Sequence, residues 1–325
     1  MLNNMDKKGG FVISLDFELG WGVQDTNRDG SYDGNLHAVH TVVPRLLELF
    51  SKYAIHVTWA TVGMLCVTSK TDLIQYLPCE KPTYSNTVFS SYEIMPSIQD
   101  KDPRYFAASL VELIKNTANQ EFATHTFSHY YCVEDGQTKE QFISDLKSAK
   151  KIAQQPLKSI VFPRNQVNKD YLSICQKEGI RAYRGNPKHP LFKSEQFLDG
   201  WHFKRIYKIA DSYLNLTGHH TFSLQQIEKN HIWNIQASAF LRPYYSRLKI
   251  LENLKLKRIV KSLQYAAKNG EIYHLWWHPH NMGKNIDENF EFLEKVLVEF
   301  TKNKEKYNFQ SYSMSDVVKN LEINN

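Results

Sequence analysis

The chain has 325 residues, 42% of them hydrophobic and 13% aromatic, with a formal net charge of +6 at pH 7, which is enough for one large α/β domain or two ordinary ones. Four widely spaced cysteines without a CxxC pair argue against a disulfide framework and a cysteine zinc site. No run approaches the roughly 18 apolar residues of a membrane-spanning helix. The first ten residues lack an apolar signal region, so we expect a soluble, cytoplasmic protein with peripheral membrane contact at most.

Strands and helices alternate through the first half of the chain. Residues 9–17 predict a buried strand, residues 36–53 predict a helix that contains Pro44, and residues 55–63 predict a second strand. This β-α-β unit is typical of a parallel sheet. The pattern continues with helices over 103–117, 138–155 and 168–179, which alternate with strands over 121–125, 157–164 and 180–185.

The second half departs from this rhythm and then resumes it. Residues 193–243 show no clear alternation and are interpreted as an irregular elaboration, whereas residues 254–270 and 286–307 predict long helices on either side of a strand over 271–278. The sequence has no internal repeat, linker or low-complexity tract. We therefore expect one domain over residues 1–325, built on a parallel α/β sheet or barrel.

Side chains with catalytic potential gather where the predicted strands end. The first strand ends in "LDFE" with Asp16 and Glu18, and a later one ends in "THTFSH" with His125 and His129. The other strand ends are "FPRNQ" (Arg164) and "HLWWHPHN" (His274, His278, His280 and Asn281). Because the carboxyl ends of parallel strands share one edge of such a fold, we expect these residues to converge there.

These residue types suit metal-assisted hydrolysis. Two histidines and one carboxylate leave open positions on a zinc-like ion, which can lower the pKa of bound water and polarise a carbonyl. A second carboxylate, held ionised by an arginine, can accept the proton of that water, and a further histidine can protonate a leaving nitrogen. The set predicts a metal-dependent amide hydrolase. Phe17 spaces Asp16 and Glu18 so that both can point to one face of the strand.

At these motifs the chain resembles the polysaccharide deacetylase superfamily, carbohydrate esterase family 4, also called the NodB homology domain. "LDFE" is similar to the spaced form of the family's acidic pair, and "HTFSH" matches its H-[ST]-x-x-H metal motif. The resemblance implies a distorted (β/α) barrel with about seven parallel strands. It also implies that Asp16 is the catalytic base and that Glu18, His125 and His129 bind the metal. Because glutamate replaces the family's usual aspartate, the choice between the two acids as metal ligand stays open.

The resemblance assigns further roles around that centre. "FPRNQ" corresponds to the motif whose arginine tethers the base, which implies this role for Arg164. "LWWH" is similar to the last motif, which implies that Leu275 contacts the acyl methyl group and that His278 is the general acid. Trp276 and Trp277 point to opposite faces of their strand, so one is expected to stack on a sugar and the other to pack in the core. Arg242, in "FLRPYYSRL", is a candidate sugar or phosphate contact.

The expected function is removal of an N-acetyl, or another short N-acyl, group from an amino sugar. Zn²⁺ is the expected metal, with Co²⁺, Ni²⁺ and Mn²⁺ as alternatives. The substrate is expected to be a lipid-linked or nucleotide-linked glycan precursor, and no nucleic-acid partner is expected because the basic residues are scattered. Two other readings stay open: a hydrolase of a cyclic amide on the same fold, and a non-catalytic glycan-binding protein.

Overall fold

A computed structural model describes residues 9–192 and 201–323 of the chain. The described strands form a single sheet in the order β6-β7-β5-β4-β3-β2-β1-β9-β8, and β10 pairs with the start of β1. Every neighbouring pair from β7 to β8 runs parallel, and only β6 is antiparallel to its neighbour. The strands are β1 Gly10–Phe17, β2 Val57–Thr61, β3 Gln120–Thr124, β4 Ser159–Ile160, β5 Ala182–Tyr183, β6 Lys229–Asn230, β7 Ile232–Asn234, β8 Ala239–Phe240, β9 Ile272–Trp277 and β10 Gln310–Tyr312.

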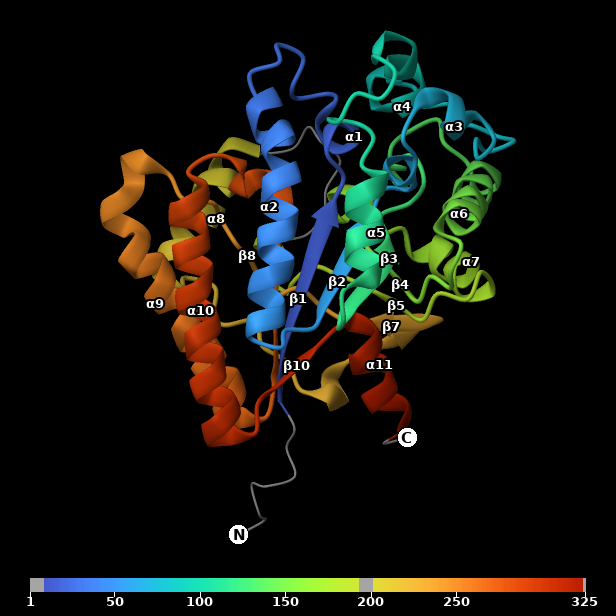
Figure 1. Cartoon of the computed structure of the whole chain (residues 1–325). Coiled ribbons are helices and arrows are strands. Elements are labelled where there is room, and N and C mark those ends of the chain that lie inside the picture. The colour runs from blue at the N-terminus through green and yellow to red at the C-terminus, as the bar shows by residue number, and fades with distance from the viewer. Residues whose placement is uncertain (1–8, 193–200, 324–325) are drawn as a thin grey trace.

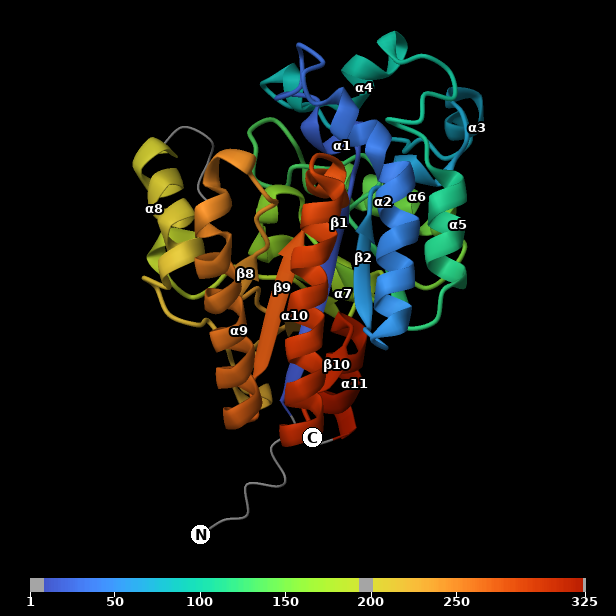
Figure 2. The same cartoon turned by 60° about the vertical axis from the view of Figure 1, so that its left-hand side comes forward.

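Helices cover the outer face of this sheet, with α2, α9 and α10 side by side outside β1 and β9 (Figure 1, Figure 2). A Thr138 capping box begins α6, and Gly270 in the left-handed conformation ends α9. None of the described helices combines the length and apolarity needed to cross a bilayer. The helices are α1 Gly20–Val23, α2 Asp33–Lys52, α3 Lys70–Ile74, α4 Ser91–Ile94, α5 Ala108–Asn116, α6 Lys139–Ala153, α7 Leu172–Lys177, α8 Trp201–Leu214, α9 Glu252–Asn269, α10 Ile286–Tyr307 and α11 Met314–Ile323.

The central strand β1 is buried along its whole length and divides its side chains between two environments. Its odd-numbered residues, from Phe11 to Phe17, join the hydrophobic layer beneath the helices. Val12 on the opposite face packs with Met314 and Val317 of α11 in a second cluster. Because side chains alternate along a strand, the polar residues of β1 share the face of Val12, which is the inside of the barrel.

The segment 232–241 closes the barrel between its two edges. After β7, the amide of Ala237 donates to the carbonyl of Gly185 (2.8 Å), and the next amide, of Ser238, donates to the carbonyl of His274 (2.8 Å). The segment thus passes directly from the β5 edge to the β9 edge. The irregular elaboration expected over 193–243 is therefore corrected for residues 201–243, which form α8 and three strands of the sheet, while residues 193–200 lie outside the described residues. The path from β7 to β8 thus has eight parallel strands, in agreement with the barrel of about seven that was expected, and β10 adds a further parallel pairing to β1.

Candidate active site

Glu18, His125 and His129 meet at the carboxyl end of β1 and β3. The Nε2 atoms of His125 and His129 lie 3.2 and 3.0 Å from the same oxygen of Glu18, Oε2. All three side chains are buried, and one ligand atom from each lies within 4.8 Å of the others. Gly22 makes room for this carboxylate, because a Cβ atom at position 22 would lie 2.0 Å from the Glu18 Cδ.

The hydrogen bonds of His125 suit it to hold a cation. Its Nδ1 lies 2.8 Å from the carbonyl oxygen of Val161, which can only accept, so Nδ1 carries the proton. Nε2 therefore presents a lone pair, and this buried atom has no hydrogen-bond partner among the described residues. An unpaired buried acceptor beside a carboxylate is costly unless a cation joins them. The donor set of two imidazoles and one carboxylate fits Zn²⁺ or a similar ion.

Asp145 of α6 holds the loop that carries the two histidines. Its carboxylate accepts hydrogen bonds from the amides of Phe127 (2.7 Å) and Ser128 (3.1 Å) and from the Ser128 hydroxyl. The loop needs this support because Thr126 and His129 both have positive φ angles, of 64° and 58°. Sequence reasoning missed Asp145, since it lies inside a helix and away from any strand end.

Asp145→Asn is expected to weaken both the fold and the site. The amide group would present a donor to N–H and O–H groups that need an acceptor, so the free energy of unfolding should fall by about 1–3 kcal/mol in urea titrations. Affinity for Zn²⁺ or Co²⁺, measured by competition with a chromophoric chelator, should fall by about 10–100-fold. Asp135→Asn is the matched control, because Asp135 is exposed. Equal metal affinity in the two variants would contradict the support role.

Asp16 forms a buried, two-pronged ion pair with Arg184. The guanidinium donates from both terminal nitrogens to the two carboxylate oxygens, each at 2.7 Å, and neither side chain reaches solvent to any extent. Burial alone would raise the pKa of Asp16, but the charge and hydrogen bonds of Arg184 outweigh it and leave the pKa below its ordinary value. Asn165 accepts from Arg184 (2.8 Å), and Ser14 does so too (3.0 Å), which fixes the orientation of the pair.

Arg184, and not Arg164, forms the ion pair with Asp16, so the role of tethering the base that the resemblance implied for Arg164 is corrected. Arg164 forms an ion pair with Asp25 instead, and its guanidinium lies 4.4 Å from the ring centre of Tyr131. The backbone explains the difference, because Arg164 has a φ of 55° in a tight turn after β4. Arg184 follows β5 directly and points into the barrel toward Asp16.

Two histidines at the exit of the last strand lie beside the carboxylates, and a third, His274, lies four residues before His278 in β9. Nε2 of His278 lies 3.4 Å from Glu18 and 3.8 Å from Asp16, and its side chain is 22% exposed. His280, expected to be a lesser contact, is buried and stacks on His278 with the ring centres 5.0 Å apart. His274 lies earlier in β9, and its Nε2 atom is 2.8 Å from the hydroxyl oxygen of Ser14. Burial lowers the pKa of both His274 and His280 to about 3, so both are neutral at physiological pH.

Several solved structures have a fold similar to that of this chain. A protein classed as a polysaccharide deacetylase from Mycobacterium smegmatis superposes with a TM-score of 0.62 at 12% identity, over 98% of this chain and 92% of that one. Another, from Pseudomonas aeruginosa PAO1, gives 0.52 at 9% identity over 95% and 89% of the two chains, and the PuuE allantoinase gives 0.50 at 10% identity over 95% and 89%. No protein-family model and no curated protein matches the sequence.

The chain has the polysaccharide deacetylase fold. The architecture expected from the sequence motifs is thereby confirmed. The deacetylase fold also explains why strand ends carry the polar cluster, because the mouth of a (β/α) barrel lies at the carboxyl ends of its strands. In this chain β1, β3, β5 and β9 supply the acids, the histidines and Arg184.

One expected substrate contact, Leu275, is corrected by the alternation of β9 in this deacetylase fold, and Trp277 is the tryptophan of the pair that packs in the core. Leu275 and Trp277 are fully buried and belong to the hydrophobic layer beneath the helices. Trp276 lies on the opposite face with His278, and its ring packs 4.1 Å from the guanidinium carbon of Arg184. Trp276 is thus the tryptophan that borders open space, and Leu275 is on the wrong face to touch an acyl group beside His278.

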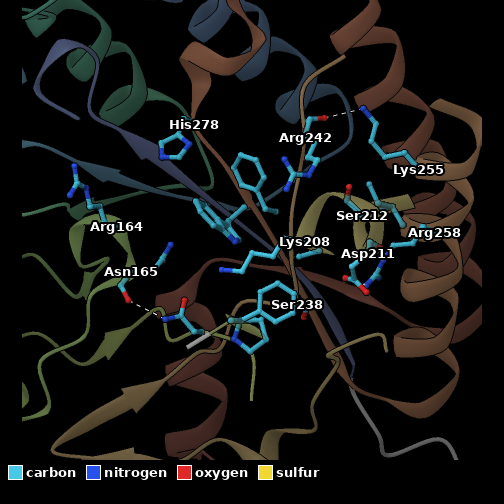
Figure 3. A pocket seen from close by; sticks show the side chains of 17 residues that line it. Arg164, Asn165, Lys208, Asp211, Ser212, Ser238, Arg242, Lys255, Arg258 and His278 are labelled. Atoms are coloured by element: carbon cyan, nitrogen blue, oxygen red, sulfur yellow. Dashed lines mark hydrogen bonds and ion pairs between the residues drawn. The ribbon is translucent and has the colours of Figure 1, made fainter. Parts of the chain in front are cut away.

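Beside His278 the mouth of the deacetylase fold opens into a cavity of about 340 Å³ (Figure 3). The aromatic part of its wall includes Phe192, Phe240 and Trp276, and the ring centres of the last two lie 4.7 Å apart. Arg242, expected as a substrate contact, also lines this cavity. The cavity is large enough for a sugar ring and a substituent.

Proposed function

We propose that the protein is a metal-dependent hydrolase that removes an N-acetyl, or another short N-acyl, group from an amino sugar. The observation that carries this proposal is the unpaired Nε2 lone pair of His125, aimed at Glu18 within reach of the Asp16–Arg184 pair. This arrangement supplies a cation site and a separate carboxylate to accept a proton. The deacetylase fold supports the assignment by analogy of architecture.

Glu18, His125 and His129 would hold the ion, most simply Zn²⁺, which when bound supplies a water of lowered pKa and polarises the acyl carbonyl. Asp16 accepts the proton of the attacking water, and Arg184 keeps Asp16 ionised and fixed while it does so. His278 donates a proton to the departing amine from the open side of the site, since its side chain is partly exposed there. Trp276 offers an aromatic face to the sugar.

The proposed substrate is an N-acetylated sugar in a lipid-linked or nucleotide-linked glycan precursor, handled in the cytoplasm. The cavity beside His278, of about 340 Å³, supports a compact substrate of this kind. It accommodates about one sugar and its substituent, whereas a long polymer would need an extended groove. No role for nucleic acid is proposed.

Hydrolysis of a cyclic amide is the second candidate, and one observation favours it: the PuuE allantoinase has a similar fold. The cluster of Glu18, His125 and His129 argues for the metal-dependent deacylase instead, because all three ligand positions of the described site carry side chains that bind metal. A purely glycan-binding role would not need the buried Asp16–Arg184 pair beside that cluster.

The test combines metal content with product release. Purified protein is expected to contain about one equivalent of a divalent metal by elemental analysis, and to release acetate from at least one member of a panel of N-acetylated sugars, sugar nucleotides and lipid-linked sugars. Dialysis against a chelator should remove both metal and activity, and Zn²⁺ or Co²⁺ should restore them. Protein that takes up no metal, or that releases acetate equally well after chelation, would refute the proposal.

A further inference from the structure

We propose that the cavity beside His278 binds an anionic group of the substrate, a phosphate or a carboxylate, through Arg242. The inference rests on the proposed function only for the identity of the molecule that carries the anion. The charged side chains that line the cavity are five basic residues and one acidic residue, Asp211. The basic residues are Arg164, Lys208, Arg242, Lys255 and Arg258.

Three of these cations already have carboxylate partners within the protein. Arg164 pairs with Asp25, and the Nζ atom of Lys255 lies 2.7 Å from Glu252. Arg258 lies 3.5 Å from the carboxylate of Asp211, the acidic residue of the cavity wall. The negative charge of Asp211 is thus paired with Arg258, which reduces its repulsion of an anion that enters the cavity.

Arg242 differs from these three residues. No carboxylate pairs with its half-buried guanidinium within residues 9–192 and 201–323, and the side chain rests near the Phe240 ring, with Cζ 5.9 Å from the ring centre. Burial and the charge of Arg205 lower the pKa of Arg242, as expected for a cation that lacks a counter-charge. Holding such a charge away from water is unfavourable unless an anion joins it. A bound anion would supply the missing partner.

The position of Arg242 fits a substituent of the same molecule that is cleaved. The Phe240 ring centre lies 6.0 Å from the ring centre of His278 and 5.9 Å from the Cζ atom of Arg242, so the proton donor and the guanidinium both neighbour the same aromatic ring. Figure 3 shows Lys208 extending into the space that Arg242 and His278 border. A sugar whose N-acyl group lies at the metal cluster could therefore place a neighbouring substituent against Arg242.

The fork of an arginine binds phosphate and carboxylate with two parallel hydrogen bonds, so the geometry recognises the chemistry they share. A phosphate would come from a nucleotide or lipid diphosphate attached to the sugar. A carboxylate would come from an acidic sugar in the glycan. The test distinguishes these two sources by using inorganic diphosphate as the phosphate probe and glucuronate as the carboxylate probe.

The test measures binding of inorganic diphosphate and of glucuronate by titration calorimetry. Wild-type protein, Arg242→Gln, Arg242→Lys and the control Arg28→Gln are compared, since Arg28 is exposed and lines none of the cavities described. Arg242→Gln is expected to bind the preferred anion at least about tenfold more weakly, Arg28→Gln to match wild type, and Arg242→Lys to recover part of the loss. Thermal unfolding verifies that each variant is folded.

Binding of diphosphate alone identifies a phosphate, and binding of glucuronate alone identifies a carboxylate. Failure of wild type to bind either anion at about 10 mM, or equal binding by Arg242→Gln and Arg28→Gln, overturns the inference. The titrations are repeated with Asp16→Asn, which should bind the anion normally and release no acetate. Acetate release without anion binding would leave the proposed function standing and refute this inference, whereas anion binding by a protein that never releases acetate would do the opposite.

Discussion

Replacing His125 with alanine is expected to remove the metal and the activity together. His125 contributes a buried nitrogen whose lone pair is already oriented by the carbonyl of Val161, so its loss leaves only Glu18 and His129 to hold the ion. We expect metal affinity to fall at least about 100-fold and acetate release to reach background. Elemental analysis after gel filtration and a coupled acetate assay on the same sample measure the two effects.

His37→Ala is the matched control, because His37 is exposed on α2. It should keep full metal content and activity. The cavity left by His125→Ala is small, and circular dichroism should show an unchanged fold. A His125→Ala protein that retains one equivalent of metal and loses its activity would contradict the assignment of His125 as a ligand.

Arg184→Met is expected to lower the free energy of unfolding by about 3–5 kcal/mol. The reason is that the variant leaves the Asp16 carboxylate buried without its cation, and an uncompensated buried charge is strongly destabilising. Adding Asp16→Asn removes that charge, so the double variant should be more stable than Arg184→Met alone. Urea unfolding of the wild type, both single variants and the double variant gives a double-mutant cycle. We expect an interaction energy between Asp16 and Arg184 of about 1–3 kcal/mol.

Arg164 supplies the control cycle, since the sequence suggested it as the tether of Asp16. Arg164 pairs with Asp25 instead, so Arg164→Met and Asp16→Asn should be additive to within about 0.5 kcal/mol. Strong coupling of Asp16 to Arg164, with none to Arg184, would show that the ion pairs form differently in solution.

The group of candidate metal ligands, together with Asp16, could be found from the sequence because its signals are local. Asp16 and Glu18 are two residues apart at the end of β1, and His125 and His129 are four residues apart just after β3. Because the carboxyl ends of parallel strands lie at one edge of the sheet, the sequence alone brings all four residues to that edge. Side-chain alternation also makes the two acids share a face, and the structure has both within 4 Å of His278.

The partner of Asp16 could not be chosen in this way. Arg164 and Arg184 both follow short strands, and the choice between them depends on a backbone turn with a φ of 55° at Arg164 that no motif encodes. Asp145 was equally hidden, because its contact with the histidine loop crosses from one element to another. In contrast, the misplacement of Leu275 was avoidable: His278 and Trp276 are two residues apart, so a strand must turn Leu275 to the other side.

The short strands β6, β7 and β8 escaped sequence reasoning because two or three residues carry too little periodicity to register. They are strands because neighbouring edges offer hydrogen bonds, as the amide of Trp233 in β7 illustrates by donating to the carbonyl of Arg181 (2.8 Å). The cavity built by the following residues, including Arg242, was therefore visible only in three dimensions.

The central place of β1 sets the order in which the sheet can form during synthesis. β1 lies between β2 and β9 and also pairs with β10, so the strand that carries Asp16 and leads into Glu18 finds two of its neighbours only near the end of the chain. The contact between Ser14 and His274 spans 260 residues, which a ribosome adding 5–20 residues per second needs roughly 13–50 s to complete. During that interval β1 has only β2 beside it in the sheet, so we expect slow maturation that is limited by these long-range strand pairings.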